Sequence, residues 1–596
     1  MAIAPVAKVT FYGTTDQKQI VLDGLQELGC LHLLDLNLQG EEIIGERHLS
    51  PDVPQALKYL RSCPIQRRAV TKESAFHFDD VLAETLTNAQ QQQELLSERD
   101  ELQQAIEKLI PWGDFRFPSD NELDGLRLWF YVVPHARFRS VEESTAIWQI
   151  VAKDQRFVYV VIVSREEPHE ISVPRVQLDD RPLSELRHRL ETIETELEEL
   201  HWQRVRLTRW IVLLSRMIGL AEDRAQRERA ARNAFDDPSL FALQGWAPQS
   251  KLELIRAFTR EHGLGLTVEA PTAEDSPPTL LSNRGLAAGG EDAVTFYTTP
   301  AYRTWDPSGV VFLSFSIFFA MIMADTGYAM LLVLILLATW RRLGCSSSLL
   351  RFRTLFAAIA FASVVYGIAV GSYFGFPPPA GSLLNRLHVI DASNSALMMR
   401  ISICIGVIHL AIANLALAWT RRWSPIMLSS IGWVAALFGG LAWGLGESGT
   451  QPQQTLIHYG SWGLQAGLLC VLLFSSSRPI TTLNPITHGR RLLDGLLALA
   501  RVSRAFGDVL SYLRLFALGL ASAQLAATFN DLANDPGGGL GGVLIVIAVV
   551  LGHGLNFVLA IMGGVVHGLR LNCIEFFGWS LPDEGYPFEP FRKRAT

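Results

Sequence analysis

Residues 309–340 read GVVFLSFSIFFAMIMADTGYAMLLVLILLATW, a stretch with no basic side chain and a single acidic one, Asp325. As one helix, this stretch would be about 48 Å long at 1.5 Å per residue, whereas the hydrocarbon core of a bilayer is about 30 Å thick. The segment is therefore either one strongly tilted crossing or a tight hairpin of two short crossings that turns at 324–327. Either way it begins a membrane domain.

The composition changes at the same point. Of the 596 residues, 49% are hydrophobic and 19% are charged. After residue 300 there are 19 Lys/Arg and 12 Asp/Glu, and the remaining 33 Lys/Arg and 47 Asp/Glu precede it. Such an asymmetry predicts an acidic soluble half followed by a membrane half. The acidic half would repel phosphate, so no nucleic-acid partner is expected.

Short strand–helix–strand patterns indicate compact α/β lobes in the soluble half. Strands are expected at 7–13 and 31–36 around a helix at 16–29, and 239–269 repeats this order with FALQGWAP and LTVEA as its strands. A third cluster has strands near 126–134 and 156–164 with a helix near 141–152 between them. The first residues do not show the basic region, apolar run and cleavage site of a signal peptide, so the soluble half is expected in the cytosol.

Two long helical segments, about 80–111 and 182–234, connect these lobes. In the second, leucine and isoleucine recur at intervals of 3, 4, 3, 4 and 3 residues, at positions 183, 186, 190, 193, 197 and 200. This heptad seam predicts an antiparallel coiled-coil rod rather than an ordinary helical domain. Six scattered cysteines form no C-x-x-C pair, and phosphate-loop, G-x-S-x-G and H-E-x-x-H motifs are absent from the sequence, so no catalytic site, cofactor or metal is expected.

Charge counting favours two crossings in 309–340. Later apolar runs lie at about 354–375, 396–419, 425–446, 460–476, 505–533 and 542–578. With two crossings, fourteen basic residues fall in cytosolic segments and only Arg386 falls in an external loop (376–395, 447–459 or 534–541), as the positive-inside rule requires. The expected architecture is an α+β cytosolic half followed by an all-α membrane domain with eight transmembrane helices and both termini in the cytosol.

The expected boundaries follow from these patterns. They are a membrane-proximal α/β lobe at 1–75 plus 235–270, a coiled-coil rod at 80–111 plus 182–234, a distal α/β lobe at 112–181, a linker at 271–308, an ion-translocating membrane domain at 309–580 and a cytosolic tail at 581–596.

Two arginines lie within apolar runs. Arg514 is in DVLSYLRLFALGLASAQLAATF and Arg570 is in NFVLAIMGGVVHGLRLNCIEFF. An arginine near the bilayer centre costs at least about 2.5–3.5 kcal/mol, so such residues usually have a function. The alternatives are that each reaches an interface or pairs with a buried carboxylate. Glycines thin the second helix so that another helix or water can approach it closely.

The motifs SYLRLFALGLA, HGLRLNCIEFFG, FFAMIMADTGYAMLL, YGIAVGSYFG and FALQGWAP resemble, in order along the chain, the a (or I) subunit of V-type and archaeal-type rotary ATPases. The resemblance implies a non-catalytic membrane stator of a proton- or sodium-translocating complex that hydrolyses or synthesises ATP. It also implies several partners: a rotating ring of c (or K) subunits, peripheral-stalk E/G-type subunits on the cytosolic lobes, a central-rotor d/C-type subunit and the bilayer of the cell membrane.

The same resemblance assigns Arg514 and Arg570 to the interface with the ring carboxylate, between two offset ion half-channels. A nearby arginine favours the charged form of a carboxylate, and arginine does not itself release its proton. The half-channel candidates are Ser511, Ser522, Gln524, Asn556, His567 and Glu575.

Some positions depart from the family pattern, and other residues have an ordinary structural interpretation. Ala560 replaces a carboxylate of eukaryotic members, Ser522 replaces a histidine, and Ala320 and Ala329 replace glycines. Asp325 is expected to cap the hairpin turn, and His409 and His553 to be structural.

Two other functional classes remain as alternatives. One is a secondary ion transporter with a regulatory coiled coil, which would need a midplane site, usually between inverted repeats. The other is a membrane-anchored scaffold, which would leave the two intramembrane arginines without a role.

Overall fold

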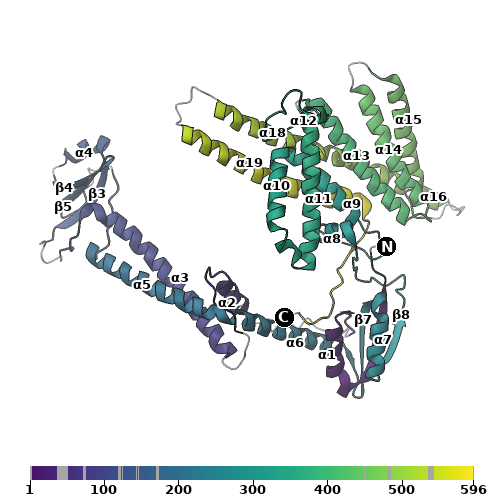
Figure 1. The fold of residues 1–596 in the computed structure, drawn as a ribbon, viewed down its shortest axis with the longest axis horizontal. Helices are drawn as coiled ribbons and strands as arrows, with labels where there is room; N and C mark the ends of the chain where they lie inside the picture. The colour runs from purple at the N-terminus through teal and green to yellow at the C-terminus, as the bar shows by residue number, and fades with distance from the viewer. Residues whose placement is uncertain are drawn as a thin grey trace. The chain divides into compact units, whose positions relative to one another are not determined.

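A computed structural model describes residues 3–36, 52–70, 76–118, 123, 125–142, 144, 146–168, 173–392, 394–448, 452–478, 485–534 and 542–594, apart from a few isolated positions. Residues 535–541 of the expected external loop 534–541, and part of the expected lobe 1–75, lie outside the described residues. The chain forms two compact units, one of residues 1–15, 30–34 and 236–590 and the other of residues 16–29, 35–235 and 591–596. Figure 1 labels their helices and strands.

Two antiparallel helices, α3 (Phe78–Leu109) and α5 (Leu183–Leu207), dominate the second unit. The predicted seam of α5 is the face that packs on α3: Leu186 and Ile193 are fully buried against Leu102, Ile106 and Leu109. Asn88 on α3 donates to Leu200 O on α5 at 3.1 Å, which fixes the register of the pair. The seam prediction is confirmed, and the coiled-coil rod itself stays a prediction.

The expected continuous helix 182–234 is interrupted. A 3₁₀ turn at Thr208–Trp210 separates α5 from α6 (Ile211–Asn233). Both sides of the turn pack into one cluster, because Leu207, Trp210 and Leu214 are buried with Leu60 of α2 (Asp52–Arg61). Helix α1 (Lys18–Leu28) packs on α6 in the same unit.

The distal lobe is a three-stranded antiparallel sheet. Its order is β3 (Arg127–Pro134), β5 (Phe157–Ser164), β4 (Ile147–Lys153), with a short α4 (Arg139–Glu142). The expected helix at 141–152 is therefore wrong from residue 147 onward. There the sequence IWQIVAK alternates between exposed and partly buried positions and pairs with β5, a period of two that suits a strand.

A second antiparallel sheet lies in the first unit. Its order is β2 (His32–Leu33), β7 (Leu240–Pro248), β1 (Val6–Thr14), β8 (Gly265–Glu269), and β6 (Phe235–Asp236) also pairs with β7. Helix α7 (Leu252–Glu261) follows β7, as the sequence pattern predicts.

Residues 271–308 and 581–590 are more ordered than a linker and a tail require. The first segment contains α8 (Ala288–Thr295), which packs on α9 and α11, and β9 (Thr299–Pro300), which pairs with β10 (Glu584–Gly585). Arg351 of α11 forms an ion pair with Asp292 of α8 at 2.9 Å. These segments therefore belong to the folded unit.

Six helical segments are long and apolar enough to cross a membrane. They are Ser347–Val370, Ser395–Thr420, Ile426–Glu447, Gln454–Phe474, Pro485–Leu532 and Val546–Ser580. The corresponding helices are α11 (Ser347–Val370), α13 (Ser395–Thr420), α14 (Ile426–Glu447), α15 (Gln454–Phe474), α16 to α18 (Pro485–Leu499, Val502–Ser511 and Leu513–Asn534) and α19 with α20 (Gly542–Arg570 and Phe577–Ser580). The short α12 (Leu383–Leu387) lies between α11 and α13.

The segment that opened the sequence analysis forms two shorter apolar helices, α9 (Ser308–Met323) and α10 (Thr326–Thr339). Ala324 adopts a left-handed conformation with φ of 46°, which ends α9 and lets the chain turn. Both helices pack on α11, and Gly367 of α11 lies against the turn, since a Cβ there would meet Thr326 N at 2.6 Å. The count of eight crossings stays a prediction.

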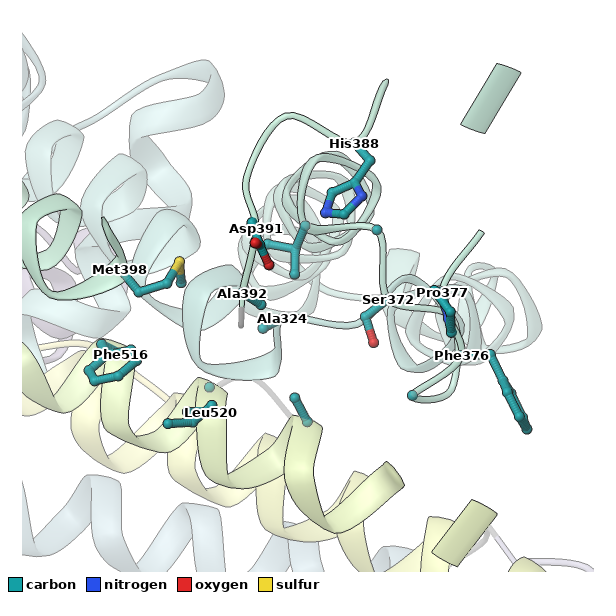
Figure 2. A pocket seen from close by; sticks show the side chains of 15 residues that line it. Ala324, Ser372, Phe376, Pro377, His388, Asp391, Ala392, Met398, Phe516 and Leu520 are labelled. Carbon is teal, nitrogen blue, oxygen red and sulfur yellow. The ribbon is translucent and has the colours of Figure 1, made fainter. Parts of the chain in front are cut away.

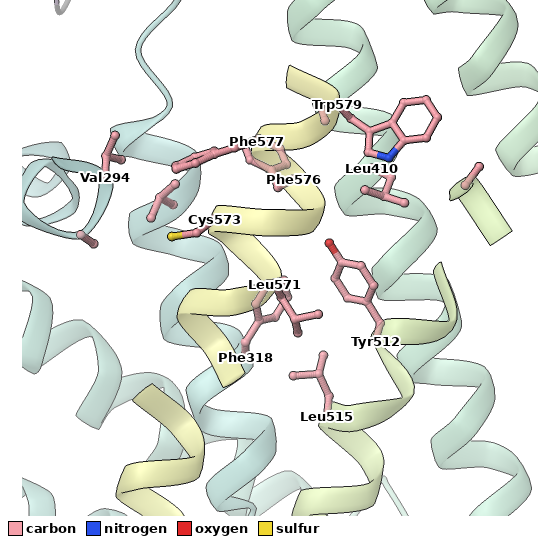
Figure 3. Close-up of a cluster of buried hydrophobic side chains, with 14 of the residues drawn as sticks. Val294, Phe318, Leu410, Tyr512, Leu515, Leu571, Cys573, Phe576, Phe577 and Trp579 are labelled. Atoms are coloured by element: carbon pink, nitrogen blue, oxygen red, sulfur yellow. The ribbon is translucent and has the colours of Figure 1, made fainter. Parts of the chain in front are cut away.

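A buried apolar cluster holds α9, α13, α18 and the segment 571–579 that follows α19 together (Figure 3). Phe318, Leu410, Tyr512, Leu515 and Phe576 are each no more than 2% exposed. This cluster brings the segments that carry Arg514 and Glu575 side by side.

Candidate functional site

Arg514 is the second residue of α18, and its nearest acidic partner is a carboxylate of the same chain. Its Nη1 atom lies 3.9 Å from Glu575 Oε1, with the two side chains 25% and 3% exposed. That distance makes an ion pair without a hydrogen bond. Arg514 Nη1 and Glu575 Oε2 are both buried and have no hydrogen-bond partner among the described residues. The pair therefore keeps unused hydrogen-bonding capacity on both sides.

Arg570 and His567 belong to the same polar region. Arg570 is the last residue of α19 and is exposed. The charges of Arg514 and Arg570 both act on His567 and on Glu575, and Ser511 also interacts with Glu575. The buried His567 Nδ1 has no hydrogen-bond partner within the described part of the chain. Three of the sequence-predicted residues, Arg514, Arg570 and Ser511, thus act on the buried Glu575 carboxylate, and the same two arginines act on His567.

A π-helix positions Glu575. Leu571–Phe576 form this wider turn directly after Arg570, and such insertions into α-helices occur frequently at functional sites. Asn572 in the turn is fully buried and accepts a hydrogen bond from Ser314 Oγ at 2.6 Å. The turn is therefore fastened to α9, and Glu575 projects from a fixed piece of backbone.

His409 links the two segments that carry the ion pair. Its ring stacks on Phe576 with centroids 4.3 Å apart, and its Nδ1 lies 2.7 Å from the Tyr512 hydroxyl. Tyr512 precedes Arg514 by two residues, and Phe576 follows Glu575. His409 thus has a structural role, as expected, and it sets the spacing of the pair.

A second polar group lies farther along α18. Ser522 Oγ donates to Asn556 Oδ1 at 3.2 Å, and Asn556 Nδ2 donates to Ser522 O at 2.9 Å. Ser522 is eight residues from Arg514, which is about 12 Å along a helix axis. The two candidates meet as a pair, at a different depth from the Arg514–Glu575 group. Gln524 belongs to neither group and lies exposed on α18.

Three residues that the sequence analysis did not propose as half-channel residues extend this second group. Asn556 Nδ2 donates to the Tyr328 hydroxyl at 3.0 Å, Tyr328 OH lies 2.8 Å from His553 Nδ1, and His553 Nε2 lies 3.0 Å from Asn530 Oδ1. Asn530 Nδ2 donates to Phe374 O, so its Oδ1 faces His553 and must accept. Hence His553 carries its proton on Nε2 and accepts from Tyr328.

With this order of donors and acceptors, the series of hydrogen bonds ties α10, α18 and α19 together. The carboxamide of Asn556 separates the Ser522 hydroxyl from the Tyr328 hydroxyl, and an amide is a fixed donor and acceptor rather than a titrating group. Protons therefore do not pass along it from end to end. No composition or spacing signal distinguishes Tyr328 and Asn530 from ordinary polar residues of membrane helices.

Asp325 caps α10, as expected. Its Oδ1 accepts from Tyr328 N and Phe374 N, both at 3.0 Å, and its Oδ2 accepts from Ser372 Oγ at 2.6 Å and Gly375 N at 2.9 Å. Four donors satisfy a carboxylate that is only 3% exposed. Asp325 thus fixes the chain reversal after α11 to the α9–α10 turn. Among the described residues, no group of three or more His, Cys, Asp or Glu could hold a metal ion.

Comparisons with known proteins find similar chains. The chain is 28% identical to V-type ATP synthase subunit I of Chlamydia pneumoniae, covering 88% of this chain and 87% of that one. It is 24% identical to V-type ATP synthase subunit I 1 of Treponema pallidum over 99% of this chain and all of that one. The chain is a homologue of subunit I of the V-type and A-type ATP synthases.

The archaeal relatives match a smaller part of this subunit I homologue. A-type ATP synthase subunit I of Methanocaldococcus jannaschii is 25% identical over 59% of this chain and 55% of its own length. Among solved structures, the cytoplasmic N-terminal domain of subunit I of V-ATPase matches at 15% identity with a TM-score of 0.23, covering 44% of this chain and 99% of that one, which is too weak to bear on the fold. No family model matches.

Proposed function

We propose that this chain is the static membrane subunit of a rotary V/A-type ATPase, which forms two ion half-channels against a rotating c/K ring and carries no ATPase site itself. Translocation of protons, or of sodium ions, would thereby be coupled to ATP hydrolysis or synthesis on other subunits. The observation that carries the proposal is the Arg514–Glu575 pair, a 3.9 Å contact between a partly exposed arginine and a buried glutamate.

The geometry of this pair suits exchange with a carboxylate from another subunit. A hydrogen-bonded, bidentate arginine–carboxylate pair is strong and would resist exchange. Here the contact is long and Nη1 keeps a free donor among the described residues. A ring carboxylate that approaches Arg514 can therefore form the better pair, lose its ion, and later be replaced by Glu575.

Two polar groups at different depths support two offset half-channels. Arg514, Arg570, His567 and Glu575 form the first group, and Ser522 and Asn556 form the second. Under the topology expected from loop charges, the first group lies nearer the cytosol and the second nearer the outside. Within the first group the guanidinium of Arg514 stays charged, and it would block direct ion flow from one group to the other.

The soluble half would anchor the stator. In a rotary complex the static subunit must resist the torque of the ring, and an antiparallel helix pair with lobes is suited to hold distance. The buried contacts between α3 and α5 and the Arg189–Glu98 ion pair at 2.8 Å stiffen this part. We propose that peripheral-stalk subunits bind its lobes and that the central-rotor subunit approaches from the cytosolic side.

The test is ATP-driven ion uptake in vesicles that hold the whole complex. Arg514→Ala should abolish uptake while the subunits still co-purify, and Arg514→Lys should largely abolish it because an ammonium lacks the planar fork. Arg501→Ala is the matched control: Arg501 is exposed and directly precedes α17, the helix before α18. Intact uptake in Arg514→Ala would overturn the mechanism and favour the scaffold interpretation.

A further inference from the structure

A cavity of about 280 Å³ lies between α18 and the segment that connects α11 to α13. Figure 2 shows the His388 ring and the Asp391 carboxylate on that segment, with Phe516 and Leu520 of α18 on the facing wall. We propose that this cavity is the proton access chamber of the outer half-channel, and that Asp391 and His388 are the groups that exchange protons with the outside solution at its mouth. The inference rests on the proposed function and assigns a site to it.

The chamber extends along α18 to the depth of Arg514. Its α18 lining runs from Phe516 to Ala523, which corresponds to about 10 Å of helix. Phe516 is two residues from Arg514, and Ala523 is next to Ser522. A proton that enters beside Asp391 therefore reaches, inside one cavity, the level at which the ring carboxylate would meet Arg514.

The backbone that forms the wall of the chamber is held in place by a hydrogen bond and by packing on α18. Gly371, Phe374 and Gly375 all have positive φ, of 69°, 52° and 78°, and the strained Phe374 is held by the hydrogen bond from its N–H to Asp325. A Cβ on Gly375 would lie 2.8 Å from Ala526 Cβ, so the segment packs directly on α18. Asp325 is thus a positioning residue for the chamber.

The chemistry of the mouth suits protons. His388 Nε2 lies 3.1 Å from Ile390 O, so in the neutral ring Nε2 carries the proton and Nδ1 is the atom that takes up another. The Asp391 carboxylate beside the opening raises the local proton concentration. During ATP-driven pumping a proton passes from a water molecule inside the chamber to Nδ1 or the Asp391 carboxylate and from there to bulk water. ATP synthesis would reverse this order, and no other reactant is needed.

The hydrogen-bonded chain through Asn556 is the competing route on the same side. It is ruled out as a relay because the Asn556 amide interrupts it between two hydroxyls. The cavity of about 280 Å³, which has room for several water molecules, then offers a path to α18.

The first experiment measures ATP-driven proton uptake by vesicles that contain the whole complex with His388→Gln and Asp391→Asn combined. The matched control combines His458→Gln and Glu447→Gln, which are exposed residues of the other described external segment and do not line the cavity. We expect about a tenfold fall for the first pair, the lower end of the gain from electrostatic focusing, and wild-type uptake for the control. Wild-type uptake in both would overturn the proposal.

The second experiment acts on protein that has already folded and assembled. Ala392→Cys, in the lining, and Leu383→Cys, an exposed residue of α12 outside it, are each treated in intact cells with a membrane-impermeant thiol reagent before vesicles are made. We expect the reagent to lower proton uptake only for Ala392→Cys, relative to the treated parent chain. Absence of labelling at Ala392→Cys, or full uptake after labelling, would overturn the chamber.

The two proposals fail separately. If Arg514→Ala pumps normally, the rotary mechanism itself is wrong. If Arg514→Ala is inactive while the chamber variants and the labelled Ala392→Cys pump normally, only the chamber assignment is wrong.

Discussion

Arg514 Nη1 and Glu575 Oε1 lie 3.9 Å apart, and neither Arg514 Nη1 nor Glu575 Oε2 has a hydrogen-bond partner among the described residues. An arginine placed for structure alone normally satisfies its donors at hydrogen-bond distance, because an unpaired buried donor costs about 1–3 kcal/mol. The proposed function gives this unused donor a role, since an acceptor from the ring can bind it during the working cycle. Under the proposed function, the pair is a resting state in which Glu575 occupies the position that a carboxylate from the ring takes during the working cycle.

Glu575→Gln should slow ion uptake by at least about tenfold without loss of assembly. The amide keeps the shape of the side chain, but it does not ionise and pairs only weakly with Arg514, so Arg514 would no longer be released from the ring carboxylate at the normal rate. The measurement is initial ATP-driven uptake in vesicles. Glu584→Gln in β10, an exposed glutamate nine residues later, should behave as wild type, and equal uptake in both variants would contradict the role of Glu575.

Asp325→Ala should lower the stability of the solubilised complex by more than a simple helix cap does. The change removes the acceptor of four hydrogen bonds and leaves the Phe374 and Gly375 amides without a partner, at about 1–3 kcal/mol for each unsatisfied buried group. Ser346→Ala, which removes the exposed cap of α11, should cost only about 1 kcal/mol. Thermal unfolding of the two variants compares them, and equal losses would argue against Asp325 as the brace of this segment.

Much of the fold could be predicted because long-period patterns determine it. The seam of α5 and the length of 309–340 each gave a geometric constraint that the structure meets, with Ile193 buried against α3 and a turn at Ala324. The prediction was wrong at 147–152, where a short segment of β-branched and aromatic residues fits a helix or a strand and only pairing with β5 decides. The break at Thr208–Trp210 depends on packing against α2, which has no local signal.

Site residues could be predicted from the sequence where placing the side chain in an apolar segment costs free energy. An arginine in an apolar run stands out whatever its neighbours are, so Arg514 and Arg570 could be found from the sequence alone. Which polar residues join them could not, because the grouping depends on how α10, α18 and α19 pack together. Ser522 and Asn556 were proposed separately and are found bonded to each other, and Tyr328 joins them from a helix about 190 residues earlier in the chain.

The contact between His32 and residue 589 should weaken in mild acid. Burial lowers the pKa of His32 from 6.5, although the nearby Glu589 carboxylate acts in the opposite direction. His32 Nδ1 accepts the Glu589 N–H at 3.0 Å, which only the neutral ring can do. A histidine whose folded-state pKa is depressed stabilises the fold above its unfolded pKa, and this stability is lost as pH falls below about 6.5 towards the folded value.

Hydrogen exchange of the Glu589 amide in the intact complex tests this pH dependence. After correction for intrinsic rates, its protection should be lower at about pH 5.5 than at about pH 7.5. His32→Phe keeps the ring contacts with Tyr586 and Phe588 but removes the acceptor, so its protection should be low and the same at both pH values. Protection that does not change with pH in the wild type would show that His32 does not hold this amide.

Ile193→Ala should loosen the α3–α5 pair, and the adjacent Glu194→Ala should not. Ile193 is fully buried against α3, so its truncation leaves a cavity that costs about 2–5 kcal/mol, whereas Glu194 is exposed and its loss should change stability by about 0.5 kcal/mol or less. Hydrogen exchange of α5 in the assembled complex measures the opening free energy of this helix directly. If torque is held by this pair, the Ile193→Ala complex should also lose coupling, with ATP hydrolysis continuing while ion uptake falls. Faster exchange with full coupling would mean that the stiffness of α3 and α5 is not what holds the stator, and equal exchange in the two variants would show that the seam does not support the pair.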